Sequence, residues 1–143
     1  MAGGYIAVKL DKNQQKEIQE VLKKAEITPV DDMHCTLIYD ENNPDIDYNT
    51  ESSKVYEATV TGVDKLGTAI VLLLKCPELA TRFKVLKELG FEHSYDDLLL
   101  HTSLVYDSED EKSDLEVIEL LYNVGVFPKV LKFTHEYNEK LED

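Results

Sequence analysis

Two stretches of seven residues carry the side chains best suited to chemistry in this chain of 143 residues. They read "HCTLIYD" at 34–40 and "HTSLVYD" at 101–107, and we call them the first and second heptad. Each heptad places a hydroxyl residue two positions after a histidine, in a chain with only four histidines. An imidazole can take or give a proton near neutral pH, and a hydroxyl can donate a hydrogen bond to a developing charge. The repeated pair therefore suggests acid–base chemistry.

The heptads read as strands, in which alternate side chains share a face. His34 and Thr36 then share one face, and His101 and Ser103 share the equivalent face of the second strand. Within each pair the side chains stand about 6.5–7 Å apart, close enough to reach one small group. We call these four side chains the quartet. If the repeat is a structural pseudo-twofold, the quartet faces one common cleft.

The quartet has the parts for cleaving a phosphodiester without a metal. One imidazole would take a proton from the attacking oxygen, the other would give a proton to the leaving oxygen, and the hydroxyls would bind nonbridging oxygens. Two such groups predict a bell-shaped pH profile. A metal site is disfavoured, because His34 and His101 would need a third ligand and hydroxyls are poor ones.

The remaining elements occur in the same order in two halves, 4–67 and 68–140, of one domain spanning 1–143. Each half has an apolar strand, a helix, a heptad strand and a strand that begins with Lys-Val. We expect strands at 5–10, 34–39, 54–67, 68–76, 101–106 and 127–137, and helices at about 11–25, 77–89 and 108–125. Ser113 and Glu116 would form a capping box, and 40–53 would be the only long loop. This pattern predicts a pseudo-symmetric α+β domain.

The composition limits the classes of molecule that this chain is expected to bind. The net charge is −14, from 15 basic and 29 acidic residues, so the average field repels a long nucleic acid while a small anion in a pocket remains possible. The first residues lack the pattern of a signal peptide, and the longest apolar run, at 69–74, is too short to span a bilayer. Cys35 and Cys76 have no paired spacing. We expect a cytoplasmic protein with reduced cysteines, no cofactor and no membrane contact.

The two H-x-[ST] motifs, one in each half, resemble the signature of the 2H phosphoesterase superfamily. The resemblance covers nearly the whole chain and implies a duplicated, bilobal fold with two antiparallel β-sheet lobes, outer helices and a central cleft. It also implies metal-independent cleavage of phosphodiesters, often through a 2′,3′-cyclic phosphate. His34 and Thr36 match the first motif, and His101 and Ser103 match the second. The resemblance does not fix which histidine is the acid.

Within the superfamily, the small size, the start "GGYIAVKL" and the two heptads are similar to the phage anti-CBASS phosphodiesterases. This resemblance implies a cyclic di- or trinucleotide substrate, a signal of bacterial immunity, opened when a ribose 2′-OH attacks the adjacent phosphate. Two alternatives stay open: a phosphodiesterase for 2′,3′-cyclic ends of RNA or small nucleotides, and a sponge that binds a cyclic nucleotide without cutting it.

Three further residues are candidates for substrate binding. Tyr5, beside two glycines that permit close approach, could stack on a base. Glu136 could orient an imidazole or accept a hydrogen bond from a base or ribose, and Tyr48 in the long loop could cap the ligand.

The tyrosines of the heptads and the two remaining histidines are not expected to bind the substrate. Tyr39 and Tyr106 fall on the strand face away from the quartet and are predicted to pack in the core. His93 and His135 lack a hydroxyl two residues later, so we expect no role for them. Lys9, Lys54 and Lys129 are candidates for phosphate contact.

Overall fold

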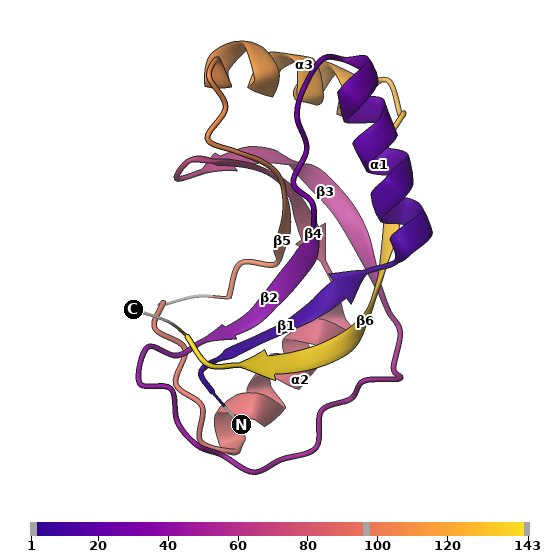
Figure 1. Cartoon of the computed structure of the whole chain (residues 1–143). Helices are drawn as coiled ribbons and strands as arrows, with labels where there is room; N and C mark the ends of the chain where they lie inside the picture. Colours follow the sequence, from indigo (N-terminus) through magenta and orange to yellow (C-terminus); the bar gives the residue numbers. More distant parts are fainter. Residues whose placement is uncertain (1–2, 96–97, 142–143) are drawn as a thin grey trace.

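The computed structural model describes residues 3–95 and 98–141 (Figure 1). Within them, six strands and three helices follow in the expected order, which confirms the α+β class. The elements are β1 (Tyr5–Leu10), α1 (Lys12–Lys24), β2 (His34–Tyr39), β3 (Tyr56–Leu66), β4 (Ala69–Lys75), α2 (Pro77–Glu88), β5 (His101–Tyr106), α3 (Glu111–Asn123) and β6 (Val130–Glu139).

The described strands form a single antiparallel sheet in the order β1-β2-β5-β4-β3-β6, which closes through pairing of β6 with β1. The expectation of two separate sheet lobes is wrong. The reason is that the last strand of each predicted half pairs with the first strand of the other, β3 with β4 and β6 with β1. In addition, β3 and β6 pair with each other, so neither half completes a sheet alone. The boundaries of the repeat, 4–67 and 68–140, stay a prediction.

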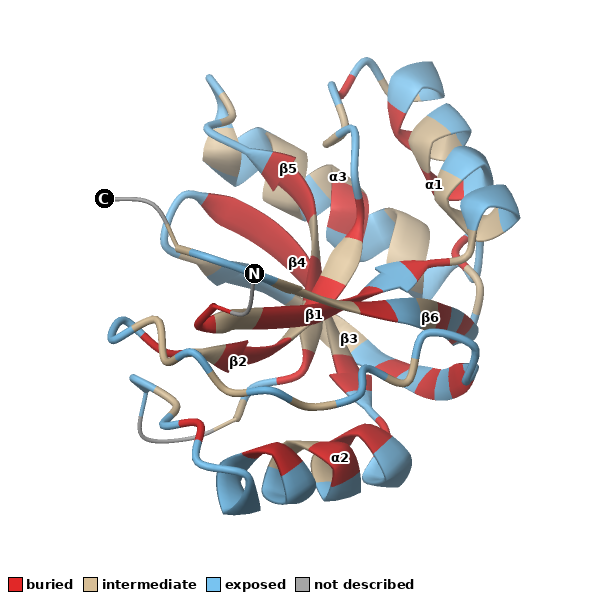
Figure 2. Ribbon diagram, turned by 60° about the horizontal axis from the view of Figure 1, so that its bottom comes forward, coloured by how far each residue is buried: buried red, intermediate tan, exposed pale blue. Residues whose placement is uncertain are grey.

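Helices lie on the outer side of the curved sheet, α1 and α3 toward one end and α2 at the other (Figures 1 and 2). Each buries an apolar face against the sheet: Ile18 and Leu22 of α1, Leu79 and Leu86 of α2, and Ile118 of α3 are buried. These side chains join one continuous core with the apolar face of the sheet.

The helix ends follow local capping rules. Asp11 caps α1 by accepting a hydrogen bond from the Gln14 amide (3.1 Å), as its position before the apolar face indicates. The predicted capping box of α3 is wrong, because Asp110 is the N-cap and accepts from the amide of Ser113 (3.2 Å). Ser113 therefore lies inside the helix.

Two long segments connect strands to other elements, so 40–53 is not the only one. The first joins β2 to β3 and runs past α2 (Figure 1). It is fixed there, since the Asn49 carbonyl accepts from Arg82 (3.1 Å) and the Glu51 amide donates to Glu136 (3.3 Å). The second joins α2 to β5 and is described up to residue 95 and from residue 98.

In the described part of the chain, every helix is too short or too polar to cross a lipid bilayer.

Candidate active site

The two heptads occupy β2 and β5, which are neighbours in the sheet and meet at one registered pair, Cys35 with Thr102. Cys35 and Thr102 hold the same position in their heptads, and both are fully buried. The residues before and after each of them therefore point to the opposite face, and these residues are the quartet. All four quartet side chains are partly exposed.

Antiparallel pairing around this point sets each histidine across from the hydroxyl residue of the other heptad. Directly opposite residues in a regular antiparallel pair have Cβ atoms about 4.5–5.5 Å apart. The registered pairing of β2 with β5 is limited to this one residue pair.

Both imidazoles are oriented by the same contact. His34 Nδ1 lies 3.2 Å from the carbonyl oxygen of Asp32, and His101 Nδ1 lies 2.8 Å from that of Leu99. A carbonyl oxygen can only accept, so each Nδ1 carries the proton. In the neutral ring the lone pair is then on Nε2, which is free to exchange a proton with a ligand.

Tyr5 joins the first half of the quartet. Its hydroxyl is hydrogen-bonded to the Thr36 hydroxyl (2.9 Å), and its ring meets the His34 ring edge-on at 6.1 Å between centroids. Burial raises the pKa of Tyr5 above its ordinary value, and nearby Tyr106 raises it further. The structure thus places Tyr5 at the quartet. Ser103 has no equivalent partner among the described residues, because Ala69 and Val71 of β4 flank the second heptad.

A bulge in each heptad corrects the expectation for Tyr39 and Tyr106. In β2, Thr36 pairs with Ala7 and Ile38 with Ile6, so Leu37 is an extra residue. In β5, Leu104 is the extra residue in the same way. Each bulge shifts the alternation by one, which buries two consecutive aliphatic residues and turns the following tyrosine to the quartet face.

Contacts agree with this placement. The Tyr39 ring lies 6.5 Å from that of Tyr5, and Tyr106 is 50% exposed, so neither tyrosine packs in the core. The error arose because period-two alternation was extended through residues 37 and 104, where it does not hold.

Glu136 lies on the other side of the sheet from the quartet. It follows a bulge in β6 at His135, which has a positive φ of 54°, and its buried carboxylate binds Arg82 of α2 (2.7 and 3.0 Å). This carboxylate raises the pKa of Arg82 above its ordinary value. The structure therefore uses Glu136 to join β6 to α2 and does not bring it to the histidines.

Tyr48 also lies away from the quartet. Its ring packs edge-on against Phe91 at 5.3 Å, and its hydroxyl is buried with no hydrogen-bond partner among the described atoms. Burial raises the pKa of Tyr48 to about 12. It lines, with Glu136, a hollow of about 580 Å³ beside β6.

Two further side chains lie beside the quartet: Lys9, a predicted candidate for phosphate contact, and Tyr137, for which the sequence predicted no role. Lys9 pairs in register with His34, and its Nζ lies 5.4 Å from the centre of the Tyr137 ring. Tyr137 also lies 6.2 Å from Tyr5. Lys9 is the one lysine or arginine of β1, β2 and β5.

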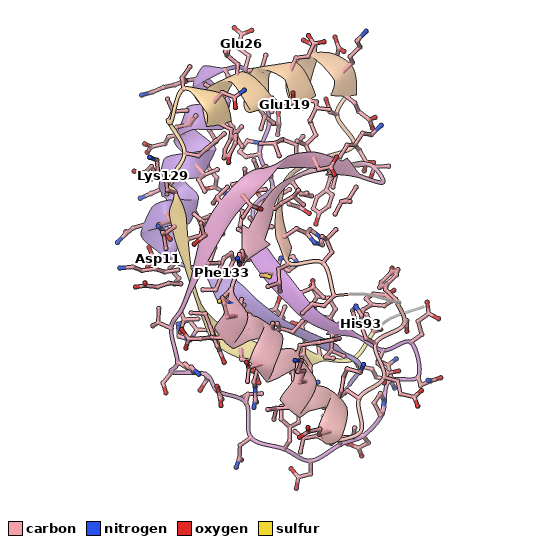
Figure 3. All side chains as sticks on the ribbon, turned by 180° about the vertical axis from the view of Figure 1, so that it is seen from behind. Asp11, Glu26, His93, Glu119, Lys129 and Phe133 are labelled. Carbon is pink, nitrogen blue, oxygen red and sulfur yellow. The ribbon has the colours of Figure 1, made fainter. Side chains whose placement is uncertain are left out.

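His93 has a structural role that was not expected. Its Nδ1 accepts a hydrogen bond from the Tyr39 amide (3.1 Å), and the Ser94 amide donates to the Tyr39 carbonyl (2.8 Å). Burial, and then the charge of Lys87, lower the pKa of His93. The segment that contains His93 (Figure 3) is thereby fixed to the end of β2, with the Tyr95 ring 5.6 Å from that of Tyr39.

A hollow of about 840 Å³ adjoins the site at Asp32 and Tyr106. Seven acidic residues line it: Glu26, Asp31, Asp32, Asp107, Glu109, Asp110 and Asp114. Such a lining repels phosphate. Among the described residues, no three His, Cys, Asp or Glu side chains lie close enough together to hold a metal ion.

Comparison with known proteins agrees with the resemblance to phage anti-CBASS proteins. A curated relative, the anti-CBASS protein Acb1 of Vibrio phage KVP40, is 30% identical over an alignment of 113 residues, and the match covers 73% of each chain. The family described as anti-CBASS protein Acb1 matches residues 2–143, nearly the whole sequence. The chain described here belongs to the anti-CBASS protein Acb1 family.

Proposed function

We propose that this protein is a metal-independent phosphodiesterase of the 2H type that opens cyclic oligonucleotides and so acts in phage counter-defence against CBASS. The observation that carries the proposal is the arrangement of the quartet around the Cys35–Thr102 pair, with both imidazoles oriented by backbone carbonyls. Membership in the anti-CBASS protein Acb1 family supports the biological role in the cytoplasm of an infected bacterium.

The proposed first step is an internal transesterification. A neutral imidazole takes the proton of a ribose 2′-OH, whose oxygen attacks the adjacent phosphorus and forms the P–O2′ bond. The P–O5′ bond breaks, and the second imidazole, protonated at the start, gives its proton to O5′. Thr36 and Ser103 donate hydrogen bonds to the nonbridging oxygens as negative charge develops there. The ring becomes a linear chain that ends in a 2′,3′-cyclic phosphate.

In the second step the imidazoles exchange roles. The imidazole that was deprotonated in the first step takes a proton from water, the water oxygen attacks phosphorus, and the other imidazole protonates O2′ as the P–O2′ bond breaks. The product ends in a 3′-phosphate. Both steps need one neutral and one protonated imidazole, so the rate should fall on each side of a pH optimum.

One experiment separates the proposal from its alternatives. The protein is incubated with 3′,3′-cyclic dinucleotides and, separately, with 2′,3′-cyclic mononucleotides, both in excess EDTA, and the products are identified by mass spectrometry. Linear products from the ring support the proposal. Opening of the mononucleotides alone would replace it with an RNA-end phosphodiesterase. Tightly bound but intact ring would replace it with a sponge.

A further inference from the structure

The bulges in β2 and β5 bring a second pair of residues to the catalytic face. Leu37 and Leu104 are the extra residues, and without them Tyr39 and Tyr106 would pack in the core. The same irregularity at the same heptad position gives each strand a tyrosine on the quartet face. A bulge commonly serves to redirect a side chain next to a functional site.

The two tyrosines lie on opposite sides of the quartet. Each follows the Cys35–Thr102 pair by four residues, but β2 and β5 are antiparallel, so the tyrosines lie in opposite directions from that pair. On one side, the Tyr5 ring lies 6.5 Å from the Tyr39 ring. On the other side, Tyr106 pairs in register with Ala69 of β4.

Both rings have surface available for a ligand. Tyr106 is 50% exposed and stacks on no other ring among the described residues. The Tyr39 ring contacts the Tyr5 ring edge-on and the Tyr95 ring at a tilt, and Tyr95 is 62% exposed. Aromatic side chains next to a phosphate site bind nucleic-acid bases by stacking, which works for every base.

Charge indicates which part of a ligand lies where. Lys9, beside His34, is the one lysine or arginine of the three strands at the site, so phosphate is favoured at the quartet. Asp107 and Asp32 line the hollow next to Tyr106 and disfavour a phosphate there. A neutral base, whose amino groups can donate to carboxylates, is compatible with that position.

We propose that Tyr39 and Tyr106 are two base-stacking positions, one on each side of the scissile phosphate, which select substrates that carry a base on both sides. The inference rests on the proposed function, because it assigns the bases relative to the phosphate that the quartet cleaves. It predicts that cyclic dinucleotides use both tyrosines, whereas a 2′,3′-cyclic mononucleotide, with one base, uses only one of them.

The test compares KM and kcat for a 3′,3′-cyclic dinucleotide and a 2′,3′-cyclic mononucleotide. Tyr39→Leu and Tyr106→Leu should each raise KM for the dinucleotide roughly 10-fold, the lower part of the range for losing a base–aromatic stack, with kcat within about twofold. Only one of the two variants should raise KM for the mononucleotide. Tyr39→Phe and Tyr106→Phe should restore the KM, because the ring is sufficient. Tyr122→Leu, on α3, is the control and should match the wild type.

Two results would overturn the inference while leaving the proposed function in place. One is an unchanged dinucleotide KM in both folded leucine variants. The other is an equal loss of kcat for both substrates, which would mean that the tyrosines position the quartet. If the wild type cuts no ring, the proposed function fails instead. In that case, calorimetry measures the affinity of each protein for the intact cyclic dinucleotide. Weaker binding to both leucine variants would support the stacking positions, and unchanged binding would contradict them.

Discussion

At the scale of single residues, the quartet combines two similar halves with different surroundings. Each imidazole is held through Nδ1 by the carbonyl two residues before it, so both present Nε2 to the ligand. The hydroxyls differ, because Thr36 is bound by Tyr5 whereas Ser103 has no hydroxyl partner among the described side chains. In the described part of the chain, the Thr36 side thus has one more hydrogen bond than the Ser103 side.

Replacement of either heptad histidine should abolish most of the activity. We expect His34→Ala and His101→Ala each to lower kcat by roughly 100-fold or more, the effect of losing one acid–base group. Both rings are partly exposed, so the melting temperature should change little. His135→Asn is the matched control, since His135 is exposed on β6 and asparagine tolerates its positive φ. Full activity in either alanine variant would contradict the assigned roles.

How far the site could be predicted depends on where the strands stay regular. Alternation of side chains holds between His34 and Thr36 and between His101 and Ser103, so these four were placed on one face from the sequence alone. It fails one residue later, at Leu37 and Leu104. A bulge depends on the pairing with a neighbouring strand, which the sequence of one strand does not contain.

At the scale of elements, close approach of three segments fixes the start of β1. A Cβ atom on Gly4 would lie 1.9 Å from the carbonyl oxygen of Asp40, and one on Gly3 would lie 2.3 Å from the Cα of Lys140. The two glycines were predicted to permit close approach of a ligand or of backbone, and here they admit backbone. Tyr5 follows them directly, so this contact also positions the phenol that binds Thr36.

Gly4→Ala should therefore destabilise the protein. We expect a loss of about 1–3 kcal/mol in the free energy of unfolding, the usual cost of forcing extra atoms into a packed site. Gly62→Ala is the matched control, because its Cβ would meet only the Leu73 side chain at 3.8 Å. Denaturant unfolding of both variants gives the comparison. Equal stability of the two would show that the chain start is not fixed at Asp40.

Burial of His93, which lowers its pKa, makes the stability of the fold depend on pH. Because the pKa of His93 is lowered in the folded protein, the unfolded chain binds the proton more readily. The stabilisation is complete above the ordinary histidine pKa of about 6.5 and is lost as pH falls through the lowered value. Protonation would also turn Nδ1 from an acceptor into a donor that faces the Tyr39 amide.

His93→Gln should remove this part of the pH dependence, because a glutamine oxygen can accept from the Tyr39 amide without titrating. Chemical unfolding at pH 7.5 and 5.5 measures the effect. The wild type should lose more stability between the two pH values than the variant does. An identical fall in both proteins would show that His93 is not the group responsible.

At the scale of the whole molecule, closure of the sheet brings the heptads together. The sequence predicted the order of elements and the class, but not that the last strand of each half pairs with the first strand of the other. Such pairings join residues far apart in the chain, for example Tyr5 with Glu139, and local patterns do not specify them.

The net charge of −14 gives the last prediction. Seven acidic residues line the hollow next to the quartet, and this acidic surface repels a long polyanion. A small cyclic nucleotide can still bind beside Lys9. A large excess of unstructured RNA should therefore not slow ring cleavage. The test is made at low salt, where interactions between charges are screened least. The linear dinucleotide product should inhibit, because it fits the same site. Competitive inhibition by the RNA would mean that the site accepts long chains, and would favour the RNA-end alternative.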